Sequence, residues 1–466
     1  MSNKRGGLTM KNQYCFLARI IIEAKTPLNI GSGNKGIKID SLVLRDINGL
    51  PFIPGTTIAG LLRHTLGDDA DKYMGSQEMG SPLIITEAKM LDSDGTVLDG
   101  IIPQEKLNSE FLANFRQLPI RQHAKIGDRG ATVKGGKFDE EIVLKGTRFC
   151  FEMEMLSDKD EDTKFKDFLN TLNSDTFRIG SSSRSGFGEI EVVGNHCLFK
   201  KINLEDPEQK EWYLKKSSSL SEKWQDAETI KLETTKTEGW TTYEIQLNPI
   251  DFMLFGSGFG NDKADMTFVR ESFVDWSTSP AMVKDCEQVI LIPASSVKGA
   301  LSHRLAFHYN KLKKIFADDL PEGKKIDDFV GKNNEAVKAV FGSEGDSVDG
   351  KISNKKRGNV LMSDIIQEAT VSSKILNHVS IDRFTGGAID GALFNEETLY
   401  AKGLSFNLKL IVNNDAFKEQ DVQTAFESSL RDLCSGILPV GGGVNRGNGC
   451  FEGTIKRNGE LIYGNN

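Results

Sequence analysis

Residues 28–46 read LNIGSGNKGIKIDSLVLRD, and residues 253–271 read MLFGSGFGNDKADMTFVRE. The two stretches align without a gap and share a Gly-Ser-Gly turn followed by a lysine, an aspartate and an arginine at fixed spacing. The shared pairs are Gly31 and Gly256, Ser32 and Ser257, Gly33 and Gly258, Lys38 and Lys263, Asp40 and Asp265, and Arg45 and Arg270. This agreement indicates that one structural unit occurs twice in the chain.

Further landmarks repeat in the same order. Residues 52–66, FIPGTTIAGLLRHTL, correspond to residues 291–305, LIPASSVKGALSHRL, and His123 corresponds to His378. Each copy closes on a glycine-rich turn, GSSSRSGFG at 180–188 and GGGVNRGNG at 441–449. We therefore predict two domains, at residues 13–198 and 241–456. The intervening residues 199–240 are rich in Lys, Glu and Ser, which predicts an exposed linker with one short helix beginning near Pro207.

The expected secondary structure is the same in both copies. Residues 14–24 and 242–247 are rich in β-branched and aromatic side chains and predict an opening strand. Pro54 and Pro293 each precede an apolar run at helical spacing, and residues 165–172 and 422–433 predict a later amphipathic helix. The order strand, helix, strand, helix, strand predicts an α+β fold with two tandem ferredoxin-like or RRM-like domains. Long polar insertions at about 70–145 and 310–402 are typical of arms or binding loops.

Composition excludes several classes of protein. The 466 residues carry a net charge of −8, whereas a general nucleic-acid coat protein needs an excess of basic residues, although a local basic groove is compatible with this value. No apolar segment has the length of a membrane span and no secretory signal is evident, so we expect a cytoplasmic protein with no membrane partner. The six cysteines form no CxxC pair, which disfavours a zinc ribbon or a disulfide framework.

The first glycine turn contains the string Gly31-x-Gly33-x-x-Gly36, which matches the dinucleotide-binding fingerprint. That fingerprint must open a helix, but residues 37–44 are β-branched and predict an extended segment. The second copy also lacks this spacing of glycines. A close approach of the backbone to some other group is therefore the preferred interpretation.

Asp40 and Asp265 occupy the same place in the two copies, seven residues after the second glycine of the turn. An aspartate there is often a turn or strand-edge residue, and its occurrence in both copies fits a shared fold role as well as a shared chemical role. The chemistry open to it is to hold a divalent metal, or to orient a 2′-hydroxyl for attack on the adjacent phosphate. No DxD motif lies nearby, so a lone carboxylate would need RNA to complete the metal shell.

Several groups suited to phosphates or bases also recur. The glycine-rich turns offer N–H groups beside Arg184 and Arg446, although a tight turn needs glycine as well. The hydroxyl pairs at the predicted helix starts either cap the helix or bind phosphate. Insertion residues 121–135 and 378–388 suit a wedge between bases or form ordinary solvated loops. The candidate RNA-binding residues are Gly31, Gly33, Thr56, Thr57, Arg63, Arg121, Arg129, Arg184, Gly256, Gly258, Ser295, Ser296, Lys298, Arg383, Phe384 and Arg446.

The stretch IGSGNKGIKIDSLVLRDINGLPFIPGTTIAGLLR, followed by GSSSRSGFGEIEV, resembles the RAMP superfamily of CRISPR-associated proteins. More closely it is similar to the backbone subunit of type III effector complexes, and two such units in one chain resemble the fused subunits of type III-D-like systems. The resemblance implies ferredoxin-like palms that stack along CRISPR RNA and projecting thumbs. It also implies cleavage of complementary target RNA with Mg²⁺ or Mn²⁺. The partners implied are other RAMP proteins and a large polymerase-like subunit.

The family's cleavage aspartate maps onto Asp40 and, by the internal alignment, onto Asp265, which makes both the expected catalytic and metal-binding residues. The family lysine of the helix start is Lys298 in the second copy but Ala59 in the first, so unequal guide contacts are expected. Two alternatives stay open. One is a non-catalytic guide-binding scaffold, and the other is a metal-independent guide-processing endoribonuclease that uses His64, His123 or His378.

Overall fold

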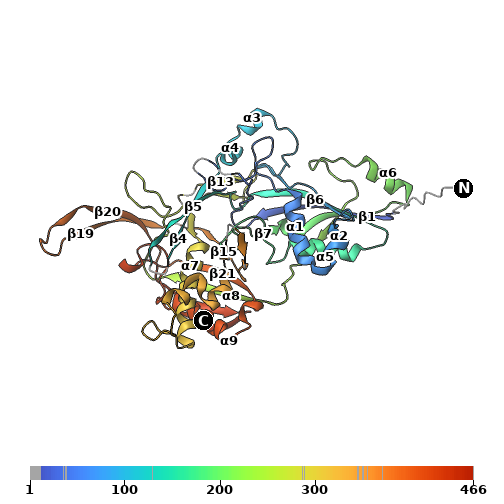
Figure 1. Cartoon of the computed structure of the whole chain (residues 1–466). Coiled ribbons are helices and arrows are strands. Elements are labelled where there is room, and N and C mark those ends of the chain that lie inside the picture. Colours follow the sequence, from blue (N-terminus) through green and yellow to red (C-terminus); the bar gives the residue numbers. More distant parts are fainter. Residues whose placement is uncertain are drawn as a thin grey trace.

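Two antiparallel sheets with helices packed against them organise the chain (Figure 1). The computed structural model describes residues 12–464 except 35, 37, 38, 128, 129, 286, 288, 344, 345, 349, 350, 354 and 370, and it describes residues 346–348 and 351–353 by their backbone alone. Each sheet belongs to one of the two predicted domains. The predicted α+β class, with two tandem ferredoxin-like domains, is confirmed.

The sheet of the first domain has β1 (Tyr14–Ala24) at its centre. Its strands lie in the order β2 (Leu83–Ile85), β6 (Arg148–Ser157), β1, β8 (His196–Asn203) and β9 (Glu228–Lys231), while β3 (Lys89–Met90) pairs with β6 and β7 (Ile190–Val192) with β1. Helices α1 (Gly55–Leu66) and α5 (Asp162–Leu172) pack on one face. Taken in chain order, the main strands are arranged 2-3-1-4, which is the ferredoxin-like order.

The second domain repeats this arrangement. Its sheet has the order β17 (Val360–Met362), β21 (Phe406–Asn413), β10 (Trp240–Pro249), β22 (Phe451–Arg457) and β23 (Glu460–Tyr463), packed against α7 (Ala294–Leu312) and α9 (Gln420–Cys434). The helix predicted at 422–433 buries its apolar face, including Phe426 and Leu430. The fourth strand of the ferredoxin-like order, β2 in the first domain and β17 in the second, was not predicted because both are too short to give a clear sequence signal.

Both faces of β1 are buried, which explains its nearly continuous apolar sequence. Phe16, Ala18, Ile20 and Ile22 point into the main core beneath the helices. The alternate residues Cys15 and Leu17 pack on the opposite face against Ile202 and side chains of the segment expected to be the linker. The first domain is therefore covered on both sides of its sheet.

The structure corrects the prediction that residues 199–240 form an exposed linker. The short helix expected near Pro207 is present as α6 (Pro207–Lys215), but β8 runs through the predicted domain end at residue 198 and β9 adds a further strand to the first sheet. Leu220 and Leu232 are buried, so residues 199–240 are not simply exposed. The reason is that the second face of β1 needs cover, which their scattered apolar side chains supply. At the other end, β23 extends the second domain beyond residue 456.

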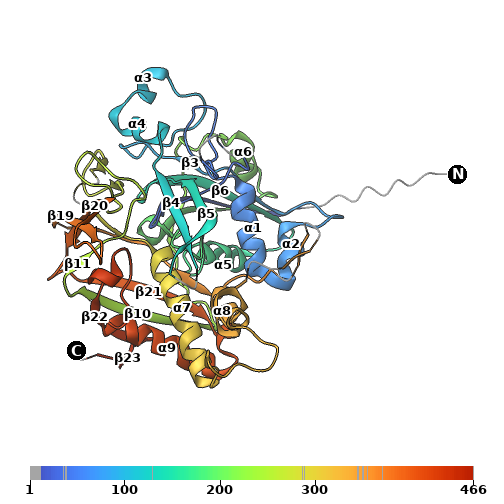
Figure 2. The same ribbon diagram turned by 60° about the vertical axis from the view of Figure 1, so that its left-hand side comes forward.

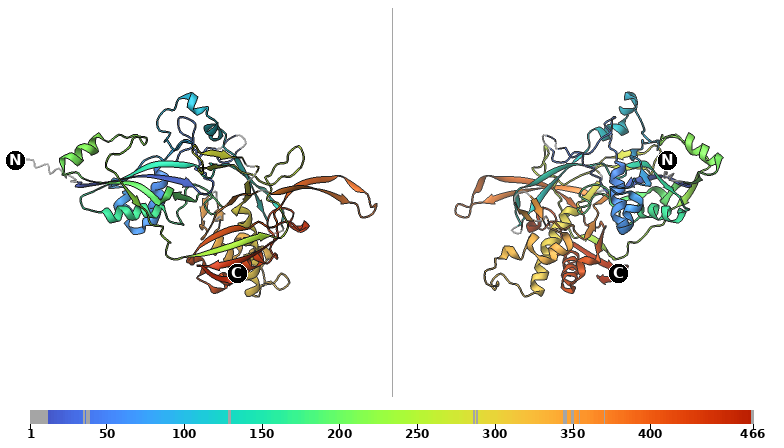
Figure 3. Two further views of the ribbon diagram at one scale, coloured as in Figure 1. Left: turned by 180° about the vertical axis from the view of Figure 1, so that it is seen from behind. Right: turned by 45° about the vertical axis from the view of Figure 1, so that its right-hand side comes forward.

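Each domain carries a projecting hairpin within its predicted insertion. The first hairpin is β4 (Ile120–Ile126) with β5 (Thr132–Glu141), and the second is β19 (Ser372–Ile381) with β20 (Ala388–Tyr400). The β19–β20 hairpin extends well away from the body of the protein (Figures 1 and 3). Figure 2 shows β4 and β5 in the middle of the molecule, between the α1 side and α7. These hairpins occupy the positions expected for the thumbs.

The remaining strands and α-helices lie within the insertions or, for β11 to β14, between β10 and α7 of the second domain. They are α2 (Ala70–Met74), α3 (Gln104–Leu107), α4 (Glu110–Arg116), β11 (Phe252–Met253), β12 (Phe273–Asp275), β13 (Met282–Lys284), β14 (Val289–Ile292), α8 (Glu335–Phe341), β15 (Asp346–Val348), β16 (Lys351–Ser353) and β18 (Ile365–Glu368). Within the described part of the chain, none of the helices combines the length and the apolar character that crossing a bilayer requires.

Candidate functional site

Asp40 lies where the glycine turn of the first domain meets the returning strand of the first hairpin. Its side-chain Oδ2 accepts a hydrogen bond from the backbone N–H of Asp139 (3.1 Å), and its own N–H donates to the carbonyl oxygen of Asp139 (3.0 Å). The turn itself is held by a hydrogen bond from the N–H of Ser32 to the carbonyl of Leu42 (2.9 Å). The Asp40 carboxylate is thus fixed in position while the residue remains exposed.

Asp265 has the same surroundings in the second domain. Its Oδ2 accepts a hydrogen bond from the N–H of Asn395 (2.9 Å) on β20, and the N–H of Ser257 donates to the carbonyl of Thr267 (2.8 Å). Asp265 is also exposed. The two aspartates therefore occupy equivalent places at the bases of the two hairpins, and their catalytic role stays a prediction.

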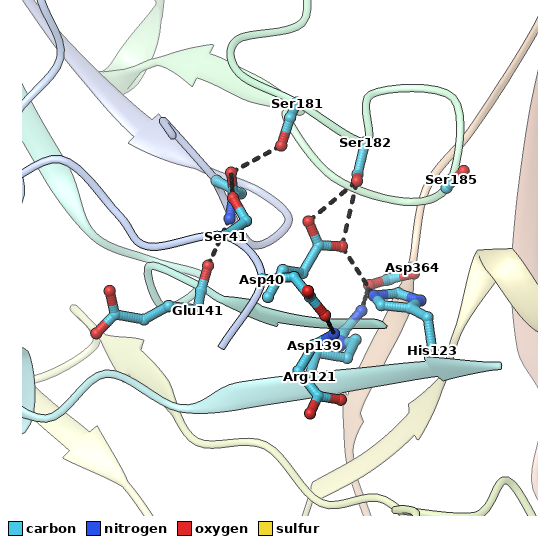
Figure 4. A network of polar contacts seen from close by, with 12 residues as sticks. Asp40, Ser41, Arg121, His123, Asp139, Glu141, Ser181, Ser182, Ser185 and Asp364 are labelled. Carbon is cyan, nitrogen blue, oxygen red and sulfur yellow. Dashed lines mark hydrogen bonds and ion pairs between the residues drawn. The ribbon is translucent and has the colours of Figure 1, made fainter. Parts of the chain in front are cut away.

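The surroundings of Asp40 fit a divalent cation better than those of Asp265. The N–H of Asp139 contacts the Asp40 carboxylate (Figure 4), and the buried Oδ1 of Asp139 has no hydrogen-bond partner. In the second domain Asn395 stands there instead, and its side-chain oxygen accepts from the N–H of Asp265 (2.7 Å). The described residues contain no cluster of three or more metal-ligating side chains. Mg²⁺ commonly binds through one or two carboxylates with phosphates completing its shell, which the pair of Asp40 and Asp139 would allow.

A histidine and a buried glutamate meet beside each aspartate. His123 Nε2 lies 2.8 Å from Oε1 of Glu140, and the ring stacks on Phe138 with centroids 4.6 Å apart. The second domain repeats the arrangement, with His378 Nε2 lying 3.2 Å from Oε1 of Glu396 and Phe394 stacked at 4.9 Å. The histidines were identified from the sequence, but their partners were not.

Those partners had a sequence signal that the internal alignment did not use. Residues 138–141 read FDEE and residues 394–397 read FNEE, which is a further repeated stretch at the base of each hairpin. The signal is short and lies across a variable insertion, so only the strand pairing makes its meaning clear. His123 lies opposite Phe138, and His378 lies opposite Phe394.

The glycine-rich closing turns of the two domains share the same backbone conformation. The N–H of Ile179 donates to the carbonyl of Gly188 (2.8 Å), and the N–H of Val440 donates to that of Gly449 (2.9 Å). Both glycines have positive φ, and a Cβ on Gly449 would lie 1.9 Å from the carbonyl oxygen of Val440. The turns contact the buried glutamates, since the Ser182 hydroxyl donates to Glu140 (3.2 Å) and the Arg446 guanidinium to Glu396 (2.6 Å). Glycine is required here by the fold itself.

Arg121 is a correction to the predicted RNA contacts. It is only 4% exposed, and its guanidinium pairs with the carboxylates of Glu271 and Asp364 in the second domain. Phe187 packs against the guanidinium plane, 4.7 Å from its carbon. The sequence placed Arg121 on a flexible basic arm, but it lies at the buried base of β4, where the two domains meet. Its charge is therefore fully used inside the protein.

Two other predicted residues, Arg383 and Phe384, lie at the end of the second hairpin. Phe384 is 99% exposed and lies with Arg383 in the turn between β19 and β20, which Asp382 stabilises by accepting from the N–H of Phe384 (2.9 Å). Arg129 lies outside the described residues. Both exposed residues of the second tip remain available for contact with a partner.

The helix starts differ between the domains. Neither α1 nor α7 has a side-chain cap, so Thr56, Thr57, Ser295 and Ser296 do not cap these helices. Arg63 lies in the last turn of α1, where it pairs with Asp71 and donates to the carbonyl of Gly75 (2.8 Å), away from the helix start. Arg63 is therefore separated from the hydroxyl pair at the start of α1, and its contact with RNA stays a prediction.

Lys298 and Arg184 come together where the domains meet. Lys298 Nζ lies 3.4 Å from the Ser185 hydroxyl, and Arg184 Nε donates to the carbonyl of Gly358 (2.9 Å). Burial lowers the pKa of Lys298, and the nearby Arg184 charge lowers it further. Burial, with Arg357 and Arg178, lowers the pKa of Arg184 to about 10. Positive groups that repel one another in this way favour an anion beside them.

The glycines predicted to contact RNA belong to the turns that hold the two aspartates. Gly33 and Gly258 have φ of 76° and 84°, which favours glycine. A Cβ on Gly258 would lie 2.1 Å from the side-chain oxygen of Gln122, so the second turn packs against the first hairpin. Gly31 and Gly256 form bridges with Val43 and Phe268. All four thus have structural roles, and contact with RNA stays a prediction.

Comparison with known proteins gives matches in both domains. The family model described as RAMP superfamily matches residues 21–191 and 278–452. The CRISPR system Cms endoribonuclease Csm3 of Methanocaldococcus jannaschii is 28% identical over 206 residues, which cover 40% of this chain and 80% of that protein. A chain of the type III-B Cmr-beta structure in its apo state matches at 17% identity with a TM-score of 0.30, over 38% of this chain and 96% of that chain. A likeness at that TM-score supports no argument on its own.

Proposed function

We propose that this chain, which belongs to the RAMP superfamily, is a fused backbone subunit of a type III CRISPR effector complex. In this proposal it binds CRISPR RNA and cleaves complementary RNA at one site in each domain. The observation that carries the proposal is the matching placement of Asp40 and Asp265, each exposed and each held by the backbone of a projecting hairpin. Similarity to a protein named as a CRISPR endoribonuclease supports the same function.

The cleavage step would use a divalent ion such as Mg²⁺ or Mn²⁺, which supplies charge stabilisation at a phosphate when bound. Asp40 and Asp139 would hold it in the first domain, and Asp265 in the second. The hydrogen bond from the N–H of Asp139 orients the Asp40 carboxylate before RNA arrives (Figure 4). The same bond from Asn395 orients Asp265. Preorganised carboxylates of this kind need little rearrangement as charge develops.

Guide binding would use the positive groups where the domains meet. Lys298 and Arg184 lie beside the closing turn of the first domain, and their pKa values are lowered by burial and by neighbouring positive charge, which a phosphate would neutralise. The exposed tip with Arg383 and Phe384 would insert between bases of the guide and target strands. Other RAMP proteins and a large polymerase-like subunit would complete the complex.

The test is cleavage of end-labelled complementary RNA by the purified complex, with Mg²⁺ or with EDTA. We would compare the wild type with Asp40→Asn and Asp265→Asn, because the amide keeps the size of the carboxylate but removes its charge. Each substitution is expected to erase one metal-dependent product while guide RNA still co-purifies. Normal cleavage at both positions in the double variant would overturn the assignment and leave the chain as a guide-binding scaffold.

A second candidate function is metal-independent processing of the guide precursor, favoured by the pairing of His123 and His378 with buried glutamates. This function predicts cleavage of precursor RNA in EDTA that is lost in His123→Gln or His378→Gln. The leading proposal predicts instead that EDTA abolishes every cleavage product of this chain. The same gel therefore separates the two functions.

A further inference from the structure

The glycine turn of the second domain contains an exposed aromatic residue, Phe259. This residue is 57% exposed, yet its backbone is held at both ends. The Phe259 N–H donates to the Ser257 hydroxyl (3.1 Å), and the Phe259 carbonyl accepts from that hydroxyl (2.8 Å) and from the N–H of Thr267 (3.2 Å). Because the backbone is fixed in this way, little conformational freedom is lost when a flat partner stacks on the ring.

The turn that carries Phe259 packs on one face of the first hairpin. Gly258 lies so close to Gln122 of β4 that an added Cβ would stand 2.1 Å from the Gln122 side-chain oxygen. Gln122 pairs with Asp139 across the hairpin, and Lys137 lies two residues before Asp139 on β5. Residues opposite each other and residues two apart on a strand share a face of the sheet. Phe259 therefore lies beside the face of the hairpin that carries Asp139.

This placement brings the ring near the first aspartate. The N–H of Asp139 holds the Asp40 carboxylate (3.1 Å) at the edge of the same strand. Residues two apart on a strand are separated by about 7 Å, so Lys137 and the ring beside it lie close to Asp40. The surroundings of Asp40 thus include a residue of the second domain as well as those of the first.

A positive charge accompanies the ring. The Lys137 Nζ lies 5.7 Å from the centre of the Phe259 ring, which is a cation–π contact between the two domains. Lys137 is itself exposed, so its charge can also be reached from solvent. An exposed aromatic ring beside a lysine offers a stacking surface for a nucleobase and a cation for the phosphate of the same nucleotide.

The equivalent residues in the other copy of each element are different. Asn34 stands in the first glycine turn where Phe259 stands in the second, and Leu393 stands in the second hairpin where Lys137 stands in the first. Since an asparagine completes the first turn, the turn itself does not need an aromatic residue at this position. The ring and the lysine meet because one comes from each domain.

We infer that Phe259 and Lys137 form a nucleotide-binding site, in which a base of the RNA at the first cleavage site stacks on the Phe259 ring while Lys137 contacts its phosphate. The second domain thereby helps to position the RNA that Asp40 acts on. Every base has a flat aromatic face, so this site positions RNA without reading its sequence. The inference rests on the proposed function, because it requires RNA to lie along the first hairpin.

The test is photo-crosslinking with RNA that carries 5-iodouridine, which on irradiation joins to an aromatic side chain stacked on it. The modified base stands at successive positions of the target RNA in one series and of the guide RNA in the other. The complete complex is irradiated in EDTA, so the measurement does not depend on cleavage. We expect an adduct on Phe259, located by mass spectrometry, and the series that gives it identifies the strand.

Variants then connect the adduct with positioning. Phe259→Leu should abolish the adduct and slow the first cleavage product about tenfold, while the second product forms at the wild-type rate. Phe259→Tyr keeps the flat ring and should retain both the adduct and the rate. The matched control is Phe316→Leu, which changes a similarly exposed phenylalanine beyond the end of α7 and should alter neither measurement. Lys137→Gln should reduce the slope of log affinity for the RNA against log salt by about one.

Adducts confined to residues other than Phe259, or a wild-type rate of the first product in Phe259→Leu, would overturn the inference. Loss of a protein subunit from the Phe259→Leu complex would overturn it as well, because the ring would then contact protein. Failure of the proposed cleavage appears differently, as intact target RNA in a complex that still gives the Phe259 adduct. A chain that purifies without RNA would contradict both proposals.

Discussion

Replacing Arg121 with methionine should loosen the contact between the two domains by several kcal/mol. The side chains of Glu271 and Asp364 are 3% and 0% exposed, so removal of Arg121 leaves two buried carboxylates without their cation. Breaking a buried ion pair in this way costs about 3–5 kcal/mol. Methionine keeps much of the packing against Phe187, so the expected loss comes mainly from charge.

Urea unfolding measures this loss, followed by the fluorescence of Trp276 in a background where Trp212, Trp224 and Trp240 are replaced by phenylalanine. The Trp276 indole N–H donates to the carbonyl of Gly146 in the first domain (2.7 Å), so it reports separation of the domains directly. The matched control is Arg63→Met, which removes an exposed pair with Asp71 and should change stability by less than about 0.5 kcal/mol. The triple variant with Glu271→Gln and Asp364→Asn should recover most of the loss.

The same variant should show a characteristic dependence on pH. Burial already raises the pKa of Glu271, and Arg121 is the nearby charge that opposes this rise. Without Arg121 the folded variant binds protons more readily than the unfolded chain, so its deficit relative to wild type should shrink as the pH falls toward the raised pKa. Equal losses for Arg121→Met and Arg63→Met, or a deficit that does not change with pH, would refute this reasoning.

Three further predictions concern the closing turn, the helix start and the hairpin tip. Lys298→Ala, which copies Ala59 of the first domain, should weaken guide RNA binding and reduce the slope of log affinity against log salt by about one, as filter binding would measure. The substitution should not lower the melting temperature of the RNA-free chain, because burial and Arg184 already lower the pKa of Lys298. An unchanged salt slope would exclude a contact between Lys298 and a phosphate. Gly449→Ala should destabilise the second domain by more than about 2 kcal/mol in chemical denaturation, because the added Cβ would overlap the Val440 carbonyl. The control Gly60→Ala, at an open helical position, should not destabilise the protein. Phe384→Ala should leave the melting temperature unchanged, because Phe384 is fully exposed, but should weaken target RNA binding or shift the second cleavage product; identical binding and products would exclude a role for the tip.

Much of the fold could be predicted from the sequence because the chain contains two copies of one pattern. A residue type that recurs at the same spacing in two divergent copies marks a position the fold requires, as Gly180 and Gly441 do in the closing turns, both at positive φ. The apolar spacing of Phe165, Phe168 and Leu169 predicted the buried face of α5, and the structure buries these residues. The placement of both aspartates in equivalent turns also followed from the alignment.

The failures have a common physical cause, which is that charge and exposure depend on distant partners. Arg121 was expected to contact RNA because it lies in a basic stretch, yet two carboxylates from the other domain bury it. The linker was expected to be exposed because it is polar, but β1 needed cover on its second face. Glu271 and Asp364 lie 150 and 243 residues from Arg121 in the chain, so the local sequence around Arg121 does not indicate the contact.

The sequence by itself determined the duplication, the class of fold, the helices with their buried faces, and the positions of Asp40 and Asp265, since each depends on periodicity or on comparison of the two copies. Only the tertiary structure decided what surrounds those positions. It placed Asp139 beside Asp40 and Asn395 beside Asp265, paired each histidine with a buried glutamate, and buried Arg121 of the first domain between two carboxylates of the second. These differences arise from contacts between strands and domains far apart in the chain, where charge and burial are decided together.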